Sequence, residues 1–161
     1  MRYRVSSCGD FMCSHCQAFV SSAHQISGVH NRNHCPYCLW SCHLDLYAAG
    51  DRLSACKAMM KPIGLTMKKG RNKYRLESGG ELMLVHECVE CHAISINRIA
   101  ADDDAEIVIT VFQESLVLHH LIQTLCYHCG IVPLNTMDIE MVYQQLYGPV
   151  MEISLIGRLL G

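Results

Sequence analysis

The sequence predicts a small α+β fold, in which β-hairpins carry metal-binding knuckles and a helical C-terminal extension follows. Three observations lead to this prediction. The 161 residues suffice for one domain, or for one small domain with an extension. The chain holds 11 cysteines and 10 histidines, several of them closely spaced. Apolar residues make up 50% of the chain and charged residues only 17%, against about 25% in an average domain, so a core can form.

Composition also excludes several classes of protein. An odd number of cysteines leaves one thiol outside any closed disulfide set. Residues 1–16 contain no apolar run of signal-peptide length, which argues against export and against a disulfide framework. The most apolar stretch, Ile107 to Leu125, is interrupted by polar residues, and we expect no membrane span. We therefore expect an intracellular reducing compartment, either cytoplasm or organelle matrix.

A Cys-x-x-Cys unit recurs four times along the chain, and four such pairs in one short chain indicate zinc. Each tight turn places two thiolates on one ion, and two turns complete a tetrahedral site. The prediction is thus a small zinc-bound α+β protein with zinc-ribbon-like hairpins, holding two zinc ions. The pairs are Cys13/Cys16, Cys35/Cys38, Cys88/Cys91 and Cys126/Cys129.

Between and after these pairs, local patterns predict the other elements. Phe19-Val20 and Leu82 to Val85 are expected as strands next to knuckles. Residues 107–112 are rich in β-branched side chains and suit a strand, whereas residues 115–127 have helical apolar spacing. A further helix is expected from an N-cap at Thr136 to Gly148, and another over residues 150–160. The expected division is a ribbon domain, 1–104, and a mainly helical extension, 105–161.

One stretch is very specific: Asn-Arg-Asn-His-Cys-Pro-Tyr-Cys-Leu-Trp-Ser at 31–41. The chain resembles the RNHCP domain family, named for the letters at 32–36, over about residues 11–104. The resemblance implies a zinc-ribbon-like fold but little about activity. The chain differs from the family pattern in its long extension with a fourth pair, and in having His92 where a knuckle commonly has glycine. Further matching segments are His43-x-Asp45, Gly50-Asp51-Arg52, Cys56, Lys61-Pro62-Ile63-Gly64, His86-x-Cys88-x-x-Cys91 and Asn97 to Asp103.

Two zinc sites follow from these residues. Site one consists of the first two pairs, Cys13, Cys16, Cys35 and Cys38, separated by a span that suits a folded hairpin. Site two uses Cys88 and Cys91 and has two possible completions. One adds His43 and Cys56, both at positions of the family pattern, and the other adds Cys126 and Cys129. If the first applies, Cys126 and Cys129 either bind a third ion with His119, His120 or His128, or are thiols at a buried helix end.

Neighbouring polar residues have expected supporting roles. His34 is expected to be a structural histidine with satisfied hydrogen bonds, and the alternative is that it supports site one by a hydrogen bond to a thiolate or a backbone group. Asp45 is expected to orient His43, and Arg98 to pair with Asp102 four residues later.

The net charge of −2 hides an asymmetry, since residues 1–75 carry +8 and residues 76–161 carry −10. A basic segment without any acid, residues 57–75, suits contact with RNA phosphates, and the alternative is a solvated loop paired with the acidic half. Its cations are Lys57, Lys61, Lys68, Lys69, Arg71, Lys73 and Arg75.

These features favour a non-catalytic zinc-binding structural protein of a ribonucleoprotein assembly, most plausibly a component of the ribosome or a factor associated with it. Its partners would be RNA, bound through the basic segment, and neighbouring proteins, bound through residues 112–161. The alternative is a protein–protein adaptor in a transcription or quality-control complex. An enzyme is less favoured, because the chain has no His-Glu-x-x-His motif and no zinc-deaminase signature.

Overall fold

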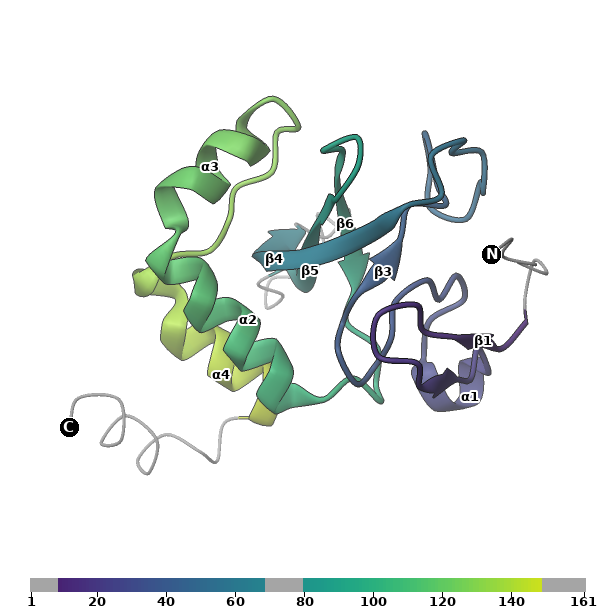
Figure 1. Cartoon of the computed structure of the whole chain (residues 1–161). Helices are drawn as coiled ribbons and strands as arrows, with labels where there is room; N and C mark the ends of the chain where they lie inside the picture. The colour runs from purple at the N-terminus through teal and green to yellow at the C-terminus, as the bar shows by residue number, and fades with distance from the viewer. Residues whose placement is uncertain (1–8, 69–79, 149–161) are drawn as a thin grey trace, which may run out of the picture.

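The structure is a computed structural model, and it describes residues 9–68 and 80–148. Its order of elements confirms a small α+β fold with short antiparallel strands followed by helices (Figure 1). The elements are β1 (Phe11–Met12), β2 (Phe19–Val20), α1 (His24–Ser27), β3 (Ser41–Cys42), β4 (Met59–Lys68), β5 (Glu81–Cys88), β6 (Ile94–Arg98), α2 (Ala105–Val117), α3 (His119–Tyr127), the 3₁₀ turn η1 (Thr136–Asp138) and α4 (Ile139–Tyr147).

The strands form two antiparallel sheets. The first is the two-stranded hairpin β1–β2, and the second has four strands in the order β3-β4-β5-β6. The predicted strands at Phe19-Val20 and Leu82 to Val85 are confirmed as β2 and part of β5. The register of β4 against β5 shifts between Pro62 and Gly64, which leaves one extra residue on β4 as in a β-bulge.

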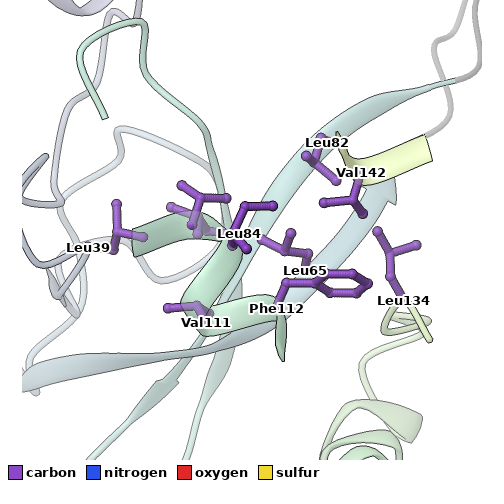
Figure 2. Packing of buried hydrophobic residues seen from close by; sticks show 10 residues of the cluster. Leu39, Leu65, Leu82, Leu84, Val111, Phe112, Leu134 and Val142 are labelled. Atoms are coloured by element: carbon purple, nitrogen blue, oxygen red, sulfur yellow. The ribbon is translucent and has the colours of Figure 1, made fainter. Parts of the chain in front are cut away.

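The main core lies between the four-stranded sheet and the helices α2 and α4, as Figure 2 shows. Leu65 and Leu84 from the sheet meet Phe112 from α2 and Val142 from α4, and all four are at most 1% exposed. A β-carbon at Gly64 would lie 3.2 Å from that of Ser115, so the absence of a side chain lets α2 approach β4 closely. Residues before and after position 104 therefore share one core. The division into a ribbon domain, 1–104, and an extension, 105–161, stays a prediction.

The prediction of a strand over residues 107–112 is wrong, because these residues belong to helix α2. The Asp104 side chain accepts hydrogen bonds from the backbone N–H groups of Glu106 and Ile107, which caps the helix. The buried positions Val108, Val111, Phe112 and Ser115 follow helical spacing and face the sheet. The cap and this buried face outweigh the strand propensity of β-branched residues.

The single helix expected over residues 115–127 is interrupted. Helix α2 ends at Val117 and α3 begins at His119, and the two axes are bent by 91°. Within residues 9–68 and 80–148, no single helix is long and apolar enough to cross a membrane, although α2 and α3 together would pass by length and composition.

The next predicted helix is confirmed with its start shifted by one residue. Asn135, rather than Thr136, provides the N-cap, and Asp138 completes a reciprocal capping box over η1. Helix α4 follows and ends at Tyr147, and Gly148, whose φ is +79°, is its C-cap. The helix expected over 150–160 lies outside the described residues.

Candidate metal centres

Three of the four Cys-x-x-Cys pairs have the same backbone geometry. In each, the carbonyl of the first cysteine accepts a hydrogen bond from the residue four positions later, and its N–H donates to the carbonyl five positions later. The residue after the second cysteine has a left-handed φ, between 57° and 62°. Such a turn aims both sulfurs to one side, as a zinc knuckle requires. These left-handed residues are Gln17, Leu39 and His92.

Site one is formed by the first two knuckles. The Cys13 and Cys38 sulfurs lie 3.6 Å apart, and those of Cys16 and Cys35 lie 3.5 Å apart. All four sulfurs fall within 4.8 Å of one another. A tetrahedral ion with Zn–S bonds of about 2.3 Å separates its sulfurs by about 3.8 Å. The donor set therefore fits a zinc ion, and the cluster could hold one.

Site two combines the third knuckle with two residues far from it in sequence. The Cys56 and Cys88 sulfurs lie 3.6 Å apart, and the Cys91 sulfur lies 3.3 Å from Nδ1 of His43. These four donor atoms also lie within 4.8 Å of one another. The structure thus brings together the first of the two completions expected for site two, and this cluster could hold a second ion.

The local surroundings shift the pKa values of the thiols, and both raised and lowered values occur within each site. Burial raises the pKa of Cys35 to about 11 and raises that of Cys38 as well. At Cys88, backbone N–H groups of Glu90 and Cys91 outweigh the effect of burial and lower the pKa to about 6. Because metals bind thiolates, occupation of site one would release protons, and acid would weaken it.

The fourth pair differs from the other three. Cys126 lies at the end of α3 and is fully buried beside Val85 and Ile122, whereas Cys129 is exposed. Here the carbonyl of Cys126 accepts hydrogen bonds from the N–H groups of Cys129 and Ile131, and Gly130 has a φ of +65°. This is a helix C-terminus ending in a left-handed glycine. Among the described residues, neither cysteine belongs to a group of three or more metal-binding side chains.

The motif at 32–36 forms a buried clamp that the sequence did not reveal. The Arg32 guanidinium donates to both carboxylate oxygens of Asp102, at 2.7 and 2.8 Å, and to Asp103 at 3.2 Å. Nε2 of His34 lies 2.8 Å from Asp103, whose carboxylate also accepts from the Ala100 N–H. The side chains of Arg32 and Asp103 are 0% exposed. The clamp therefore fixes site one to the start of α2, and His34 is a structural histidine, as predicted.

This clamp also corrects a predicted pair. Arg98 does not bond Asp102, because strand β6 places it beside Glu81 of β5, at 2.9 Å. The signal available in the sequence was weak, since Arg32 and Asp102 are separated by 70 residues. The sequence offered one hint of this pair, namely a charged residue, Arg32, within the motif of a chain that has few charged residues.

A second link joins site one to the sheet. His86 of β5 is fully buried, and its Nε2 lies 2.7 Å from the carbonyl of Leu39, the left-handed residue of the second knuckle. Its Nδ1 lies 3.0 Å from the Asn97 amide nitrogen of β6. Burial lowers the pKa of His86 to about 3, so the ring is neutral and donates from Nε2 to the carbonyl.

Two aspartates hold the loop between His43 and Cys56. Asp45 accepts from the backbone N–H groups of Gly50 and Arg52, so it shapes this loop and the predicted role of orienting His43 is wrong. Asp51 accepts from four backbone N–H groups, including that of Leu53, and these bonds lower its pKa. The loop thereby carries Cys56 back to site two.

The basic segment is described only in part. Lys57, Lys61 and Lys68 are exposed, and the register places Lys61 opposite Glu87 and Lys68 opposite Glu81. The lysines on β4 therefore face acidic residues of the same chain. The remaining cations of this segment, Lys69, Arg71, Lys73 and Arg75, lie outside the described residues.

Comparison with known families gives one match. A family model described as the RNHCP domain matches residues 8–109, which is more than half of the chain and includes all eight residues of the two clusters. No curated protein and no solved structure matches the sequence.

Proposed function

This chain belongs to the RNHCP domain family, and the matched region contains both metal clusters. We propose that it is a non-catalytic zinc-binding structural protein of a ribonucleoprotein assembly. The assembly would be the ribosome, with this chain as a component or associated factor. Two zinc ions would hold the ribbon-like hairpins together, and exposed basic residues would contact RNA.

The closure of both clusters is the observation that carries this proposal. Each cluster supplies four protein donors at tetrahedral spacing. A catalytic zinc keeps three protein ligands and one open position for water or substrate, whereas a structural zinc has four. Two closed sites thus favour cross-links that stabilise a small domain over a zinc enzyme.

The RNA contact is supported by the distribution of charge. Residues 1–75 carry +8, and the segment 57–75 contains seven cations and no acid. Because β4 lysines face glutamates on β5, the strand itself offers less positive potential than the sequence predicted. The contact would therefore depend on Lys57 and on residues beyond the strand, and it would weaken steeply with salt.

A sedimentation gradient of native lysate tests this proposal. The protein should migrate with large particles and move to the top of the gradient after ribonuclease treatment. A K69E/R71E/K73E variant, which reverses charges beyond the strand, should lose this migration, whereas Arg98→Glu, a charge reversal at an exposed site outside the segment, should retain it. A slow peak that ribonuclease does not change would overturn the proposal.

A protein–protein adaptor is the second candidate, and one observation favours it. The bend between α2 and α3 exposes Val117, Leu118 and Leu121, which are 84%, 53% and 56% accessible. Because Phe112, Leu134 and Val142 belong to the core, removal of residues 112–161 would unfold the protein and could not test this idea. A V117N/L121N variant should instead keep its fold and its metal while losing protein partners, with ribonucleoprotein migration unchanged.

A further inference from the structure

A cavity of about 350 Å³ lies beside site one. The first knuckle, the motif at 31–33 and the loop that precedes β4 all contribute to its wall. We call it the Trp40 cavity, because it is lined by the chain's only tryptophan. Its volume falls in the range of about 300–1,000 Å³ that is usual for small-molecule sites.

The ionic side chains of the cavity are mostly basic. Arg52 and Lys57 line it together with three histidines, and Asp10 is the only acidic residue among its described lining. The Asp10 carboxylate already accepts a hydrogen bond from the N–H of Ser22, at 2.9 Å. Arg32 also lines the cavity but is neutralised by the aspartates of the clamp. Arg52 and Lys57 together outweigh the single negative charge of Asp10, so the cavity favours an anion.

Arg52 carries a donor without an acceptor. Its Nη1 is buried and has no hydrogen-bond partner in the part of the chain that the structure describes. The other guanidinium nitrogens have only weak partners, namely Asp45 at 3.9 Å from Nε and the Arg32 carbonyl at 3.5 Å from Nη2. A buried charged donor is costly unless an acceptor meets it, and the planar fork of arginine suits two phosphate oxygens.

Lys57 supports the same site from the neighbouring backbone. Its Nζ donates to the Arg52 carbonyl at 3.0 Å, which holds the Lys57 ammonium beside the main chain of Arg52. Both residues have a left-handed φ of 55°, so the loop adopts an uncommon conformation that keeps them on this wall. Such local strain is often found where a site is preorganised.

Aromatic rings also line the cavity. The His15 ring stacks on Trp40 with centroids 4.2 Å apart and an angle of 6° between the planes. His24 and His30, which also line the cavity, stack at 4.2 Å with an angle of 17°. Flat π surfaces of this kind bind nucleobases by stacking, largely without regard to sequence.

We propose that the Trp40 cavity binds a nucleoside phosphate, with its phosphate at Arg52 and Lys57 and its base against the His15–Trp40 pair. The same unit occurs in a free mononucleotide and in single-stranded RNA. For the RNA source, the inference rests on the function proposed above and assigns the nucleotide contact to this cavity.

Intrinsic fluorescence of Trp40 provides a direct test on the full-length, zinc-loaded protein. Titration with UMP, AMP and a single-stranded octauridylate should quench the emission saturably. Uridine and inorganic phosphate alone should each bind at least tenfold more weakly. Arg52→Gln should weaken nucleotide binding at least tenfold and Lys57→Gln severalfold, whereas Arg98→Gln, the same change at an exposed arginine outside the cavity, should have no effect.

Zinc content and thermal unfolding verify that each variant is folded. If Arg52→Gln does not fold, Lys57→Gln still tests the inference. Tighter binding of the octamer than of UMP identifies RNA as the source, and equal binding identifies the free nucleotide. A response to phosphate as strong as that to UMP, or quenching that Arg52→Gln leaves unchanged, overturns the inference. If no nucleotide quenches Trp40 but the protein still sediments in a ribonuclease-sensitive particle, this inference fails and the proposed function stands.

Discussion

Asp103→Asn is the substitution that most directly tests the role of the clamp. The Asp103 carboxylate is fully buried and faces three donors: the Ala100 N–H, Nε2 of His34 and Nη2 of Arg32. The amide keeps the shape of the side chain but removes its charge and replaces one acceptor oxygen with a donor. At least one buried donor then loses its acceptor.

The expected loss of stability follows from these contacts. Removing one partner of a buried ion pair costs about 3–5 kcal/mol. Arg32 keeps its two bonds to Asp102, so we expect the lower value, about 3 kcal/mol. For a chain of this size that loss lowers the melting temperature by about 6–12 °C.

Thermal and urea unfolding in zinc-containing buffer measure this loss, and atomic emission verifies that the metal content is unchanged. Asp102→Asn is the matched control, because Asp102 is 27% exposed and solvent replaces part of what is lost, so about 1–2 kcal/mol is expected. A loss below 1 kcal/mol for Asp103→Asn, or one no larger than that of Arg98→Gln on the surface, would refute the account of the clamp.

Three further predictions concern site two, the loop that carries Cys56 and the contact between α2 and α4. Cys56→Ser should reduce the zinc content from two ions to one, and two ions in this variant would contradict the ligand set. Cys42→Ser should keep both ions, because the Cys42 sulfur belongs to neither cluster and among described partners bonds only the Lys57 carbonyl. Gly50→Ala should lower the unfolding free energy by about 1–3 kcal/mol, since φ is +88° and the new β-carbon would lie 2.6 Å from the Asn31 side chain; unchanged urea unfolding would contradict this strain. Tyr147 donates a hydrogen bond to Glu106, and burial and this carboxylate raise the pKa of Tyr147 to about 12. The folded state therefore holds this proton to a higher pH than the unfolded state does. The resulting contribution to stability is present below pH 10 and disappears as the pH rises toward 12. Tyr147→Phe should lack that alkaline loss in unfolding experiments, and an identical pH profile would count against it.

The helical half illustrates where local reasoning succeeds and fails. The capping residues at 135–138 and the glycine at 148 were readable, because caps depend on hydrogen bonds within a few residues. Residues 107–112 were assigned the wrong element, since β-branched composition favours a strand when the burial of one helical face is unknown. The break at Leu118 likewise depends on how α2 and α3 pack, which spacing alone does not specify.

By itself, the sequence determined the α+β class, the family and the knuckles, because a Cys-x-x-Cys turn forms through bonds between neighbouring residues. Only the tertiary structure decided that His43 and Cys56 join Cys88 and Cys91, while the fourth pair ends a helix. It also decided that Arg32 pairs with Asp102 and Asp103, and that Lys61 and Lys68 face glutamates. The physical reason is that these contacts join residues up to 71 positions apart, and strand register and core packing, rather than local spacing, bring such residues together.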